Sequence, residues 1–262
     1  MNGAEPGDGA GSAPGAVPEV GRLRARYVRR VTAEHVRARV SIRHLADDPE
    51  RGPLPTDVVG RLLALDEDTV VVIDRAGRLH VLDANRVIAS RVVPPHPRLP
   101  AEPDVGTEDH PVARRASRVL VLDPDDRVLL VSHAPSADRR VWTAPGGGLE
   151  PEEDPLDGAR RELREEIGIT PPIGPWIWRR RVTFAFRSVW IDQDERWFLA
   201  RLDDSTEPTD APLDDAGAIE VRWWSLDELG TTDQALAPAA LPTHLQRLLR
   251  DGPPDEPVDV GY

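Results

Sequence analysis

Six prolines within residues 94–111 constrain this chain more than any other feature. Proline fixes φ and lacks the backbone N–H, so a segment this rich in proline can continue neither a helix nor a central strand. The segment therefore predicts a stiff linker between two domains, one spanning 21–93 and the other 112–252. Residues 1–20 are rich in Gly, Ala and Pro and predict a disordered tail, and 253–262 predict a second tail.

Five short apolar segments follow one another within residues 21–93. Turn-forming residues separate them, and this spacing is typical of a small all-β barrel. The segments are 36–42, 57–65, 69–74, 78–82 and 86–92. The strand pattern resembles the SH3-type domain that precedes some bacterial acetyltransferases. Such domains also serve as protein or dimer contacts, so we include a homodimer among the expectations.

The charge balance restricts the partners. The chain carries 33 basic and 46 acidic residues, a net charge of -13, which disfavours nucleic acid and anionic membranes. Residues 22–43 are an exception, with eight arginines against the single acid Glu34. A basic barrel could bind nucleic acid there, although a charged solvent face is the simpler interpretation.

Several protein classes are excluded. The absence of cysteine rules out disulfides and thiolate chemistry. The start of the chain has no secretory pattern, and no apolar run approaches the ~20 residues of a membrane helix. We therefore expect a cytoplasmic protein with no membrane partner.

The chemistry-bearing pattern lies in the second domain. Residues 154–167 have the periodicity of an amphipathic helix, with an apolar stripe at positions 156, 159, 163 and 167. Glu162, Glu165 and Glu166 cluster on an adjacent face, where their charges repel. A hard divalent cation would turn that repulsion into attraction, since Mg²⁺ and Mn²⁺ take carboxylate oxygens. The loop Gly146 to Gly148 before the helix could approach a ligand closely. Together they suggest metal-assisted phosphoryl or pyrophosphoryl chemistry, whereas acidic residues on a helix are more often only a solvated face.

The order of residues favours the first interpretation. Residues 147–169 match in full the Nudix box, Gly-x5-Glu-x7-Arg-Glu-U-x-Glu-Glu-x-Gly-U, where U is aliphatic. The matching residues are Gly147, Glu153, Arg161, Glu162, Leu163, Glu165, Glu166, Gly168 and Ile169. Residues 112–250 thus resemble the Nudix hydrolase family, with one mild departure at Ala144, where an aliphatic residue such as Leu is common.

This resemblance implies an α+β fold, in which a mixed sheet is sandwiched between helices and a small all-β barrel precedes it. It also implies hydrolysis of a nucleoside diphosphate linked to another moiety, NDP-X, into NMP and P-X, with Mg²⁺ or Mn²⁺ as cofactor. The resemblance makes Glu162, Glu165 and Glu166 the metal-binding carboxylates, joined by the backbone carbonyl of Gly146 or Gly147. It assigns the catalytic set to Glu162, Glu166, Arg161 and Glu153, in which Glu162 or a neighbour is the base, Glu153 assists, and Arg161 orients the carboxylates.

Weaker signals complete the candidate site. Many family members use a further acid outside the box, and Glu195 is the best candidate, ahead of Asp214, Asp215 and Glu220. Phe184 could stack on a base, although core packing is the more frequent role of such a side chain. Gly146, Glu195 and Phe184 form the candidate substrate-binding set.

No substrate-specifying motif is recognisable in the sequence. Two other function classes therefore stay open. One is a Nudix-fold sensor of a nucleotide-linked metabolite without turnover, which the complete set of box carboxylates disfavours. The other is an adaptor that acts through the N-terminal barrel.

Overall fold

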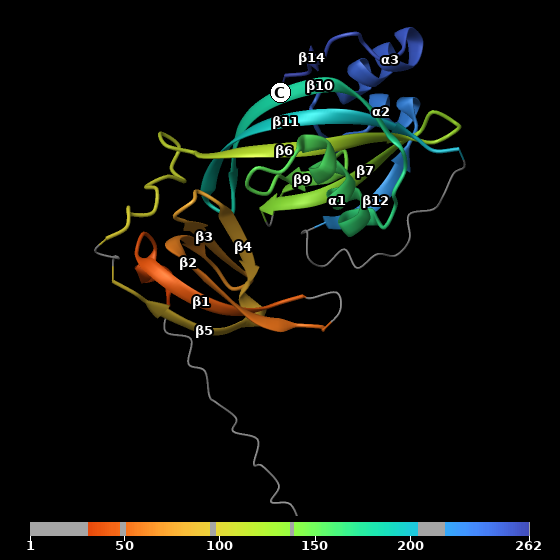
Figure 1. Ribbon diagram of the computed structural model, residues 1–262. Coiled ribbons are helices and arrows are strands. Elements are labelled where there is room, and N and C mark those ends of the chain that lie inside the picture. Colours follow the sequence, from red (N-terminus) through yellow and green to blue (C-terminus); the bar gives the residue numbers. More distant parts are fainter. Residues whose placement is uncertain (1–30, 48–50, 95–97, 137–138, 204–217, 262) are drawn as a thin grey trace, which may run out of the picture.

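The computed structural model describes residues 31–47, 51–94, 98–136, 139–203 and 218–261. The expected tail 1–20, the arginines of 22–30, and Asp214 and Asp215 lie outside the described residues. Figure 1 shows two bodies, an all-β part below and a mixed part above. No helix among the described residues is both long and apolar enough to span a membrane.

The N-terminal part is one antiparallel sheet, called sheet A. Its strands are β1 (Arg39–Ala46), β2 (Leu54–Leu65), β3 (Thr69–Asp74), β4 (Leu79–Asp83) and β5 (Val87–Val92), in the order β4-β3-β2-β1-β5. Short 3₁₀ turns lie at Ala33–His35 and Ala84–Arg86. The five strands coincide closely with the five predicted segments. Buried aliphatic side chains such as Val40, Leu62 and Val72 form its core. An SH3-type barrel stays a prediction, since β4 and β5 stand at the two ends of the strand order.

The second part is a mixed nine-stranded sheet, called sheet B. Its main path runs β13-β8-β7-β6-β11-β10-β14, with β12 paired to β7 and β9 paired to β6. The strands are β6 (Val112–Leu122), β7 (Val128–Ser136), β8 (Arg139–Thr143), β9 (Gly146–Gly148), β10 (Ile173–Phe186), β11 (Val189–Arg201), β12 (Ala218–Trp224), β13 (Ala235–Ala237) and β14 (Val258–Asp259). Strands β6 and β11 are parallel, and β10 and β11 form a long antiparallel hairpin.

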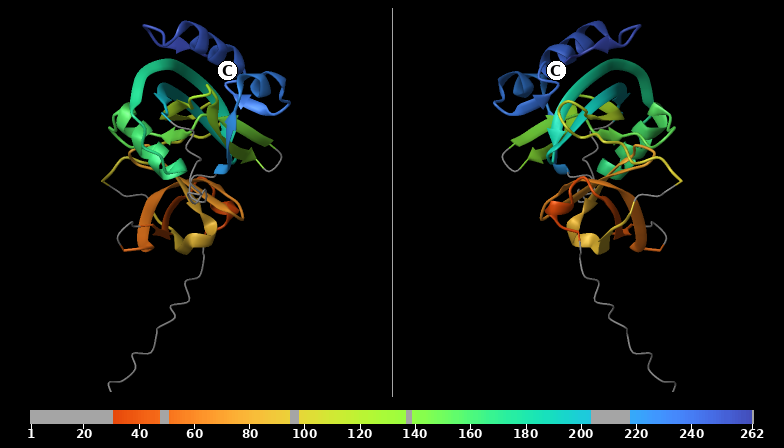
Figure 2. Two further views of the ribbon diagram at one scale, coloured as in Figure 1. Left: turned by 90° about the vertical axis from the view of Figure 1, so that its right-hand side faces the viewer. Right: turned by 90° about the vertical axis from the view of Figure 1, so that its left-hand side faces the viewer.

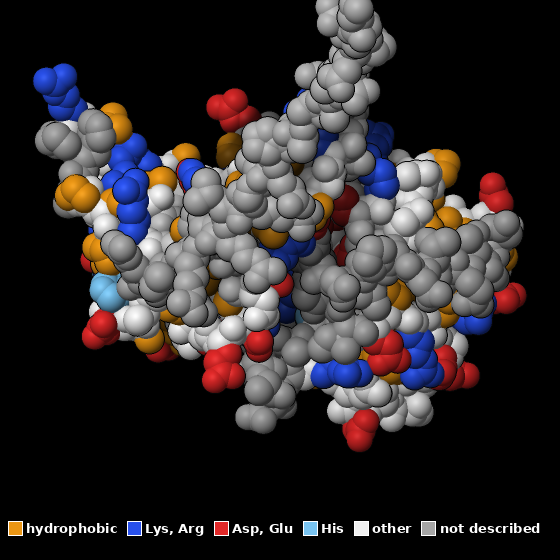
Figure 3. Space-filling model, turned by 90° about the horizontal axis from the view of Figure 1, so that it is seen from below, with side chains coloured by type: hydrophobic (Ala, Val, Ile, Leu, Met, Phe, Trp, Pro, Cys, Tyr) orange, Lys and Arg blue, Asp and Glu red, His pale blue; other side chains and the backbone are white. Residues whose placement is uncertain are grey.

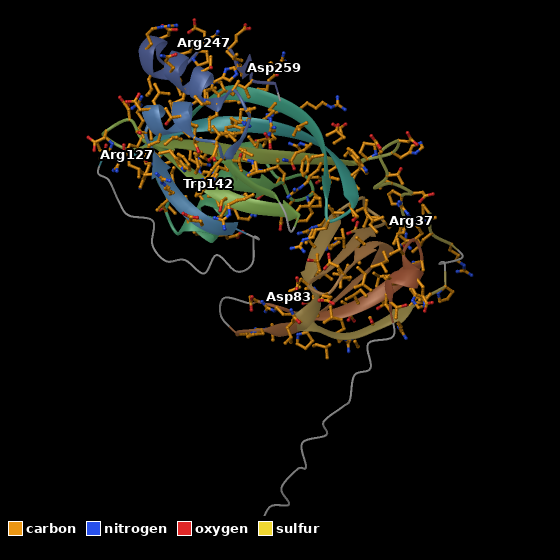
Figure 4. All side chains as sticks on the ribbon, turned by 180° about the vertical axis from the view of Figure 1, so that it is seen from behind. Arg37, Asp83, Arg127, Trp142, Arg247 and Asp259 are labelled. Atoms are coloured by element: carbon orange, nitrogen blue, oxygen red, sulfur yellow. The ribbon has the colours of Figure 1, made fainter. Side chains whose placement is uncertain are left out.

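Helices cover both faces of sheet B, as Figures 1 and 2 show. Helix α1 (Pro155–Ile167) packs on one face, and α2 (Leu226–Thr231) and α3 (Leu241–Asp251) pack on the other. Successive side chains of a strand point to opposite faces, so Val119 and Val121 of β6 contact the α1 side while Leu120 and Leu122 contact the α3 side. Trp142 of β8 lies in the core on the α3 side (Figure 4). The expected fold class, a helix–sheet–helix sandwich preceded by an all-β part, is confirmed.

The proline-rich segment is bonded to both sheets. The Arg39 Nε–H donates to Glu102 Oε1 at 2.7 Å, and the Arg61 Nη2–H donates to the Glu102 carbonyl at 3.0 Å. Farther along, the Trp190 N–H at the start of β11 donates to the carbonyl of Gly106 at 3.0 Å. The segment between the two sheets is therefore bonded to sheet A through Glu102 and to sheet B through Gly106, in addition to being rich in proline.

Sheets A and B also contact each other directly through one apolar cluster, which we call the docking cluster. It joins Leu63, Val71 and Ile73 of sheet A with Val112 and Val189 of sheet B, all of them buried. Beside it, Arg78 of the β3–β4 turn pairs with Glu150, two residues after the glycine loop, at 3.2 Å. The N-terminal part therefore borders the segment that carries the predicted box.

The C-terminal end differs from the expected tail at 253–262. Strand β14 pairs in parallel with β10, and Val260 is buried in the core on the α3 side. The Arg180 Nε–H donates to the carbonyl of Gly261 at 3.0 Å. Burial of one valine and pairing to a strand edge are enough to hold this short segment, and the sequence pattern missed it because two strand residues carry no periodicity.

Candidate active site

Helix α1 carries most of the candidate residues, and its packing fixes their direction. Asp154 caps the helix by accepting a hydrogen bond from the Leu156 N–H at 2.8 Å, Pro155 is its first residue, and Gly168 ends it with φ of 71°. Leu163 and Ile167 are buried against sheet B. Glu162 and Glu166 thereby face the glycine loop, whereas Glu165 is exposed.

Arg161 holds the carboxylates together. Its guanidinium donates to both oxygens of Glu153, at 2.9 and 3.0 Å, to Glu162 Oε1 at 2.8 Å and to Glu165 Oε2 at 3.1 Å. It also donates to the carbonyl of Gly148 at 3.1 Å. The hydrogen bonds from Arg161 hold the pKa of the Glu153 carboxyl below its usual range. Four of the predicted site residues thus form one charge-assisted cluster.

Glu166 lies in a buried position and is not one of the carboxylates to which Arg161 donates hydrogen bonds in this cluster. Its side chain is 3 % exposed, and it accepts a hydrogen bond from the Gly146 N–H at 2.8 Å. His133 Nε2 lies 3.5 Å from its other carboxyl oxygen. Burial raises the pKa of Glu166 to about 7. Burial also raises the pKa of Glu162, to which the charge of Glu165 adds, and the charge of Glu162 adds to the raised pKa of Glu166.

The glycines of the loop are required by close contacts. A β-carbon on Gly147 would lie 2.7 Å from a carboxyl oxygen of Glu162, and one on Gly146 would lie 2.1 Å from the Ser117 carbonyl oxygen. Gly146 also has a φ of 133°, which favours glycine. The loop can therefore lie directly against both β6 and the carboxylates.

The donor set suits a divalent cation in its chemistry. Glu162, Glu165 and Glu166 offer hard oxygen ligands from one helix, and burial raises the pKa values of Glu162 and Glu166 because it disfavours their charged forms. In the described part of the chain, however, no three His, Asp or Glu side chains converge in a geometry that could hold an ion. Glu162 and Glu165 are turned to Arg161, so ion binding requires these side chains to move. Glu165, about half exposed, is free to do so.

Glu195 and Phe184, the candidates outside the box, lie on the hairpin. Glu195 of β11 is 1 % exposed and is surrounded by hydrogen-bond donors. Phe184 of β10 is half-buried and pairs with Ile191, four residues along β11 from Glu195. It lies toward the end of the hairpin that contacts sheet A. Glu220 of β12 is exposed and pairs with Arg140 at 2.9 Å, away from the cluster.

Three arginines of sheet B stand near the candidate residues. Arg114 and Arg118 of β6 were not considered from the sequence, whereas Arg180 of β10 belongs to three consecutive strand arginines for which a contact to substrate phosphates and plain surface exposure were both open. Arg114 lies against Gly148, where a β-carbon would be 2.5 Å from its Nε, and it donates to Gln193 at 3.1 Å. Strand alternation could have found them, since Arg114 and Arg118 share a face and Arg180 alone of Arg179 to Arg181 points inward. Figure 3 shows acidic side chains recessed in one face of the molecule with arginines beside them.

Helix α1 and the glycine loop thus form a loop–helix unit that brings glutamates and an arginine together against a mixed sheet. The NUDIX domain family model matches residues 112–246, more than half of the chain, and the chain belongs to this family.

Known relatives match over a short segment. The chain is 50% identical over 50 residues to diphosphoinositol polyphosphate phosphohydrolase 3-alpha of Mus musculus, covering 19% of this chain and 29% of that protein. It is 46% identical over 52 residues to diphosphoinositol polyphosphate phosphohydrolase 2 of Rattus norvegicus, covering 20% and 28%. The chain thus spans less than a third of the length of these curated relatives.

Among solved structures, the chain is similar to the MutT protein from Methanosarcina mazei Go1, with a TM-score of 0.41 and 21% identity over 53% of this chain and 94% of that one. It is also similar to a NUDIX hydrolase from Nitrosomonas europaea, with a TM-score of 0.40 and 20% identity over 55% and 94%.

Proposed function

We propose that this protein is a metal-dependent pyrophosphohydrolase that cleaves the diphosphate linkage of a nucleoside diphosphate derivative, NDP-X, into NMP and P-X. The observation that carries the proposal is the pair of carboxylates beside the glycine loop, the buried Glu166 and the partly buried Glu162, whose pKa values are both raised. Carboxylates with pKa values raised by burial cost folding free energy, and such groups cluster at functional sites.

The proposed ligands are Glu162, Glu165 and Glu166, with the carbonyl of Gly147, for Mg²⁺ or Mn²⁺. When bound, such an ion supplies neutralisation of the diphosphate and a lowered pKa of a coordinated water. Arg161 orients Glu153 through two charge-assisted hydrogen bonds, and it holds Glu162 and Glu165 through one each. Glu162 or Glu166, with its pKa moved toward neutrality, is suited to accept a proton from the attacking water.

The names of the relatives favour a second substrate class. Diphosphoinositol polyphosphates carry the same phosphoanhydride bond as NDP-X, on a more highly charged scaffold. Arg114 beside the glycine loop suits an anionic substrate of either class. The substrate test therefore has to include both.

The test is a panel of a nucleoside diphosphate sugar, a nucleoside triphosphate and a diphosphoinositol polyphosphate, each with Mg²⁺, with Mn²⁺ and with chelator. We expect cleavage of one class, measured by product chromatography, that chelator abolishes. Glu166→Gln keeps the side-chain shape and removes the charge, so kcat should fall roughly 100-fold or more. The matched control is Asp157→Asn, an exposed first-turn carboxylate of the same helix that pairs with Arg160.

Two outcomes would contradict the proposal. Normal turnover by Glu166→Gln would refute the assigned site. Intact, ion-binding protein that cleaves nothing in the panel would favour a sensor or adaptor that keeps the NUDIX fold without turnover.

A further inference from the structure

Glu195 has no free oxygen with which to act as a ligand or a base. Its Oε1 accepts from Gln193 at 2.7 Å and from Arg118 at 3.4 Å, and its Oε2 accepts from Trp197 at 2.9 Å and from Arg180 at 3.3 Å. The charges of Arg118 and Arg180, with these hydrogen bonds, outweigh burial and hold the pKa of Glu195 below its usual range. Glu195 is therefore a carboxylate whose two oxygens are both engaged and whose charged form is favoured by its two arginine neighbours.

Arg118 connects this carboxylate to the glycine loop. The parallel pairing of β6 with β11 sets Arg118 within reach of Glu195, and its Nε–H points to that carboxylate. From the other end of the same guanidinium, the Nη1–H donates to the carbonyls of Ala144 at 3.1 Å and Gly146 at 2.7 Å. A planar guanidinium with several fixed donors can hold both ends of this bridge, which an ammonium cannot.

Gly146 is the residue at which this bridge meets the active site. Its carbonyl accepts from Arg118, and its N–H, which belongs to the preceding peptide group, donates to the buried Glu166 at 2.8 Å. The loop is also fastened to β6 through the backbone, because the Pro145 carbonyl accepts from the Val119 N–H at 2.9 Å and β9 pairs with β6. The hydrogen bonds from Arg118 thus fix the carbonyls of Ala144 and Gly146 on either side of the N–H that donates to Glu166.

We propose that Glu195 and Arg118 are positioning residues: Glu195 orients Arg118, and Arg118 positions Gly146, whose N–H holds Glu166 in place. This assignment replaces the ligand or base expected at Glu195, and it rests on the proposed function only for its effect on turnover. Residues that orient the ligands of a metal site through hydrogen bonds typically change metal affinity or activity 10- to 100-fold when they are altered.

Arg118→Lys is the sharpest variant. It keeps the positive charge next to Glu195, but one nitrogen cannot reach Glu195 and both carbonyls together. Glu195→Gln is the second variant, because it removes the charge and places an amide donor among groups that are all donors. Asp192→Asn is the matched control, since Asp192 lies on the same strand, pairs with the exposed Arg181 at 3.0 Å and takes no part in the bridge.

The first readout needs neither metal nor turnover. Hydrogen exchange of the Gly146 amide, followed by NMR on the metal-free full chain, should become about tenfold faster or more in Arg118→Lys and stay unchanged in Asp192→Asn. The second readout is Mn²⁺ binding followed by electron paramagnetic resonance, where we expect an affinity roughly 10- to 100-fold weaker in both bridge variants. In the active protein, kcat should fall with little change in KM.

Wild-type Gly146 exchange and wild-type Mn²⁺ affinity in folded Arg118→Lys would overturn the proposal and leave the bridge a purely structural ion pair. If Glu195→Gln fails to fold, Arg118→Lys decides alone. If the wild-type chain binds Mn²⁺ but cleaves no substrate, the proposed function fails, while the exchange and binding results still decide the role of the bridge.

Discussion

Glu166 is deeply buried and accepts a backbone hydrogen bond from Gly146. The pH at which it loses its proton therefore reports how strongly the site disfavours a negative charge. A carboxyl in water ionises near its ordinary 4.5, whereas burial raises the pKa of Glu166 to about 7. The unfolded chain therefore loses this proton at a lower pH than the folded chain does. At neutral pH, the cost of burying the charged form of Glu166, or of keeping it protonated, lowers the free energy of unfolding of the metal-free protein.

This difference predicts a pH dependence of stability. Between pH 4.5 and about 7 the folded state binds the Glu166 proton and the unfolded state does not, so the free energy of unfolding should fall as pH rises through this window. The fall attributable to this residue is at most about 3 kcal/mol. Urea unfolding in chelator, compared between wild type and Glu166→Gln, isolates it. Curves that run parallel from pH 4.5 to 7.5 would show that Glu166 is not perturbed.

At the scale of the element, α1 shows how much the sequence determines locally. Its predicted span, 154–167, agrees with Pro155–Ile167 because the signal is a local one, the apolar stripe at positions 156, 159, 163 and 167. The strands of sheet A were predictable for the same reason, since alternation and turn residues lie next to each other in the chain. The orienting role of Arg161 came from the resemblance to the Nudix family, and its contacts to Glu162 and Glu165 lie within this one helix.

The rest of the site depends on contacts between distant segments. Arg118 and Glu195 meet only because β6 and β11 are parallel neighbours in one register. No pattern within either strand specifies its partner or its register. For this reason the sequence offered Glu195 only as a candidate ligand or base, with a solvated charge as the more frequent role, and it gave no reason to place Arg118 beside it.

The cap of α1 gives a prediction at this scale. Asp154→Ala removes the acceptor of the Leu156 N–H and should lower the free energy of unfolding by about 1 kcal/mol, whereas Asp154→Asn should restore most of it. Urea titration measures both variants. Equal stability of the alanine and asparagine variants would mean that the hydrogen bond at 2.8 Å does not stabilise the helix.

At the scale of the whole molecule, sheets A and B meet in the docking cluster, where apolar side chains of both are buried together. Shared burial couples their stabilities, because separating the sheets would expose these side chains to water. Arg78 and Glu150 extend the contact from sheet A to the segment that follows the glycine loop. Sheet A is therefore placed to affect the candidate site through the segment it touches.

The docking cluster predicts one calorimetric unfolding transition for the wild-type chain. Val189→Asp places a charge without a partner in the cluster, so it should separate this transition into two. Val81→Asp is the matched control, because Val81 of β4 is 48% exposed and stands outside the cluster. Two transitions already present in the wild type would mean that the cluster does not couple the sheets.

The segment between the sheets keeps the two halves of the docking cluster together, although the contact itself consists of only five buried side chains. Two separate proteins with so small a contact would dissociate at ordinary concentrations, but a short tether presents each surface to the other at an effective concentration in the millimolar range. Glu102 and Gly106 shorten the free part of that tether further. Association of the two sheets is thus a property of chain connectivity, and a single cut between them would make it depend on dilution.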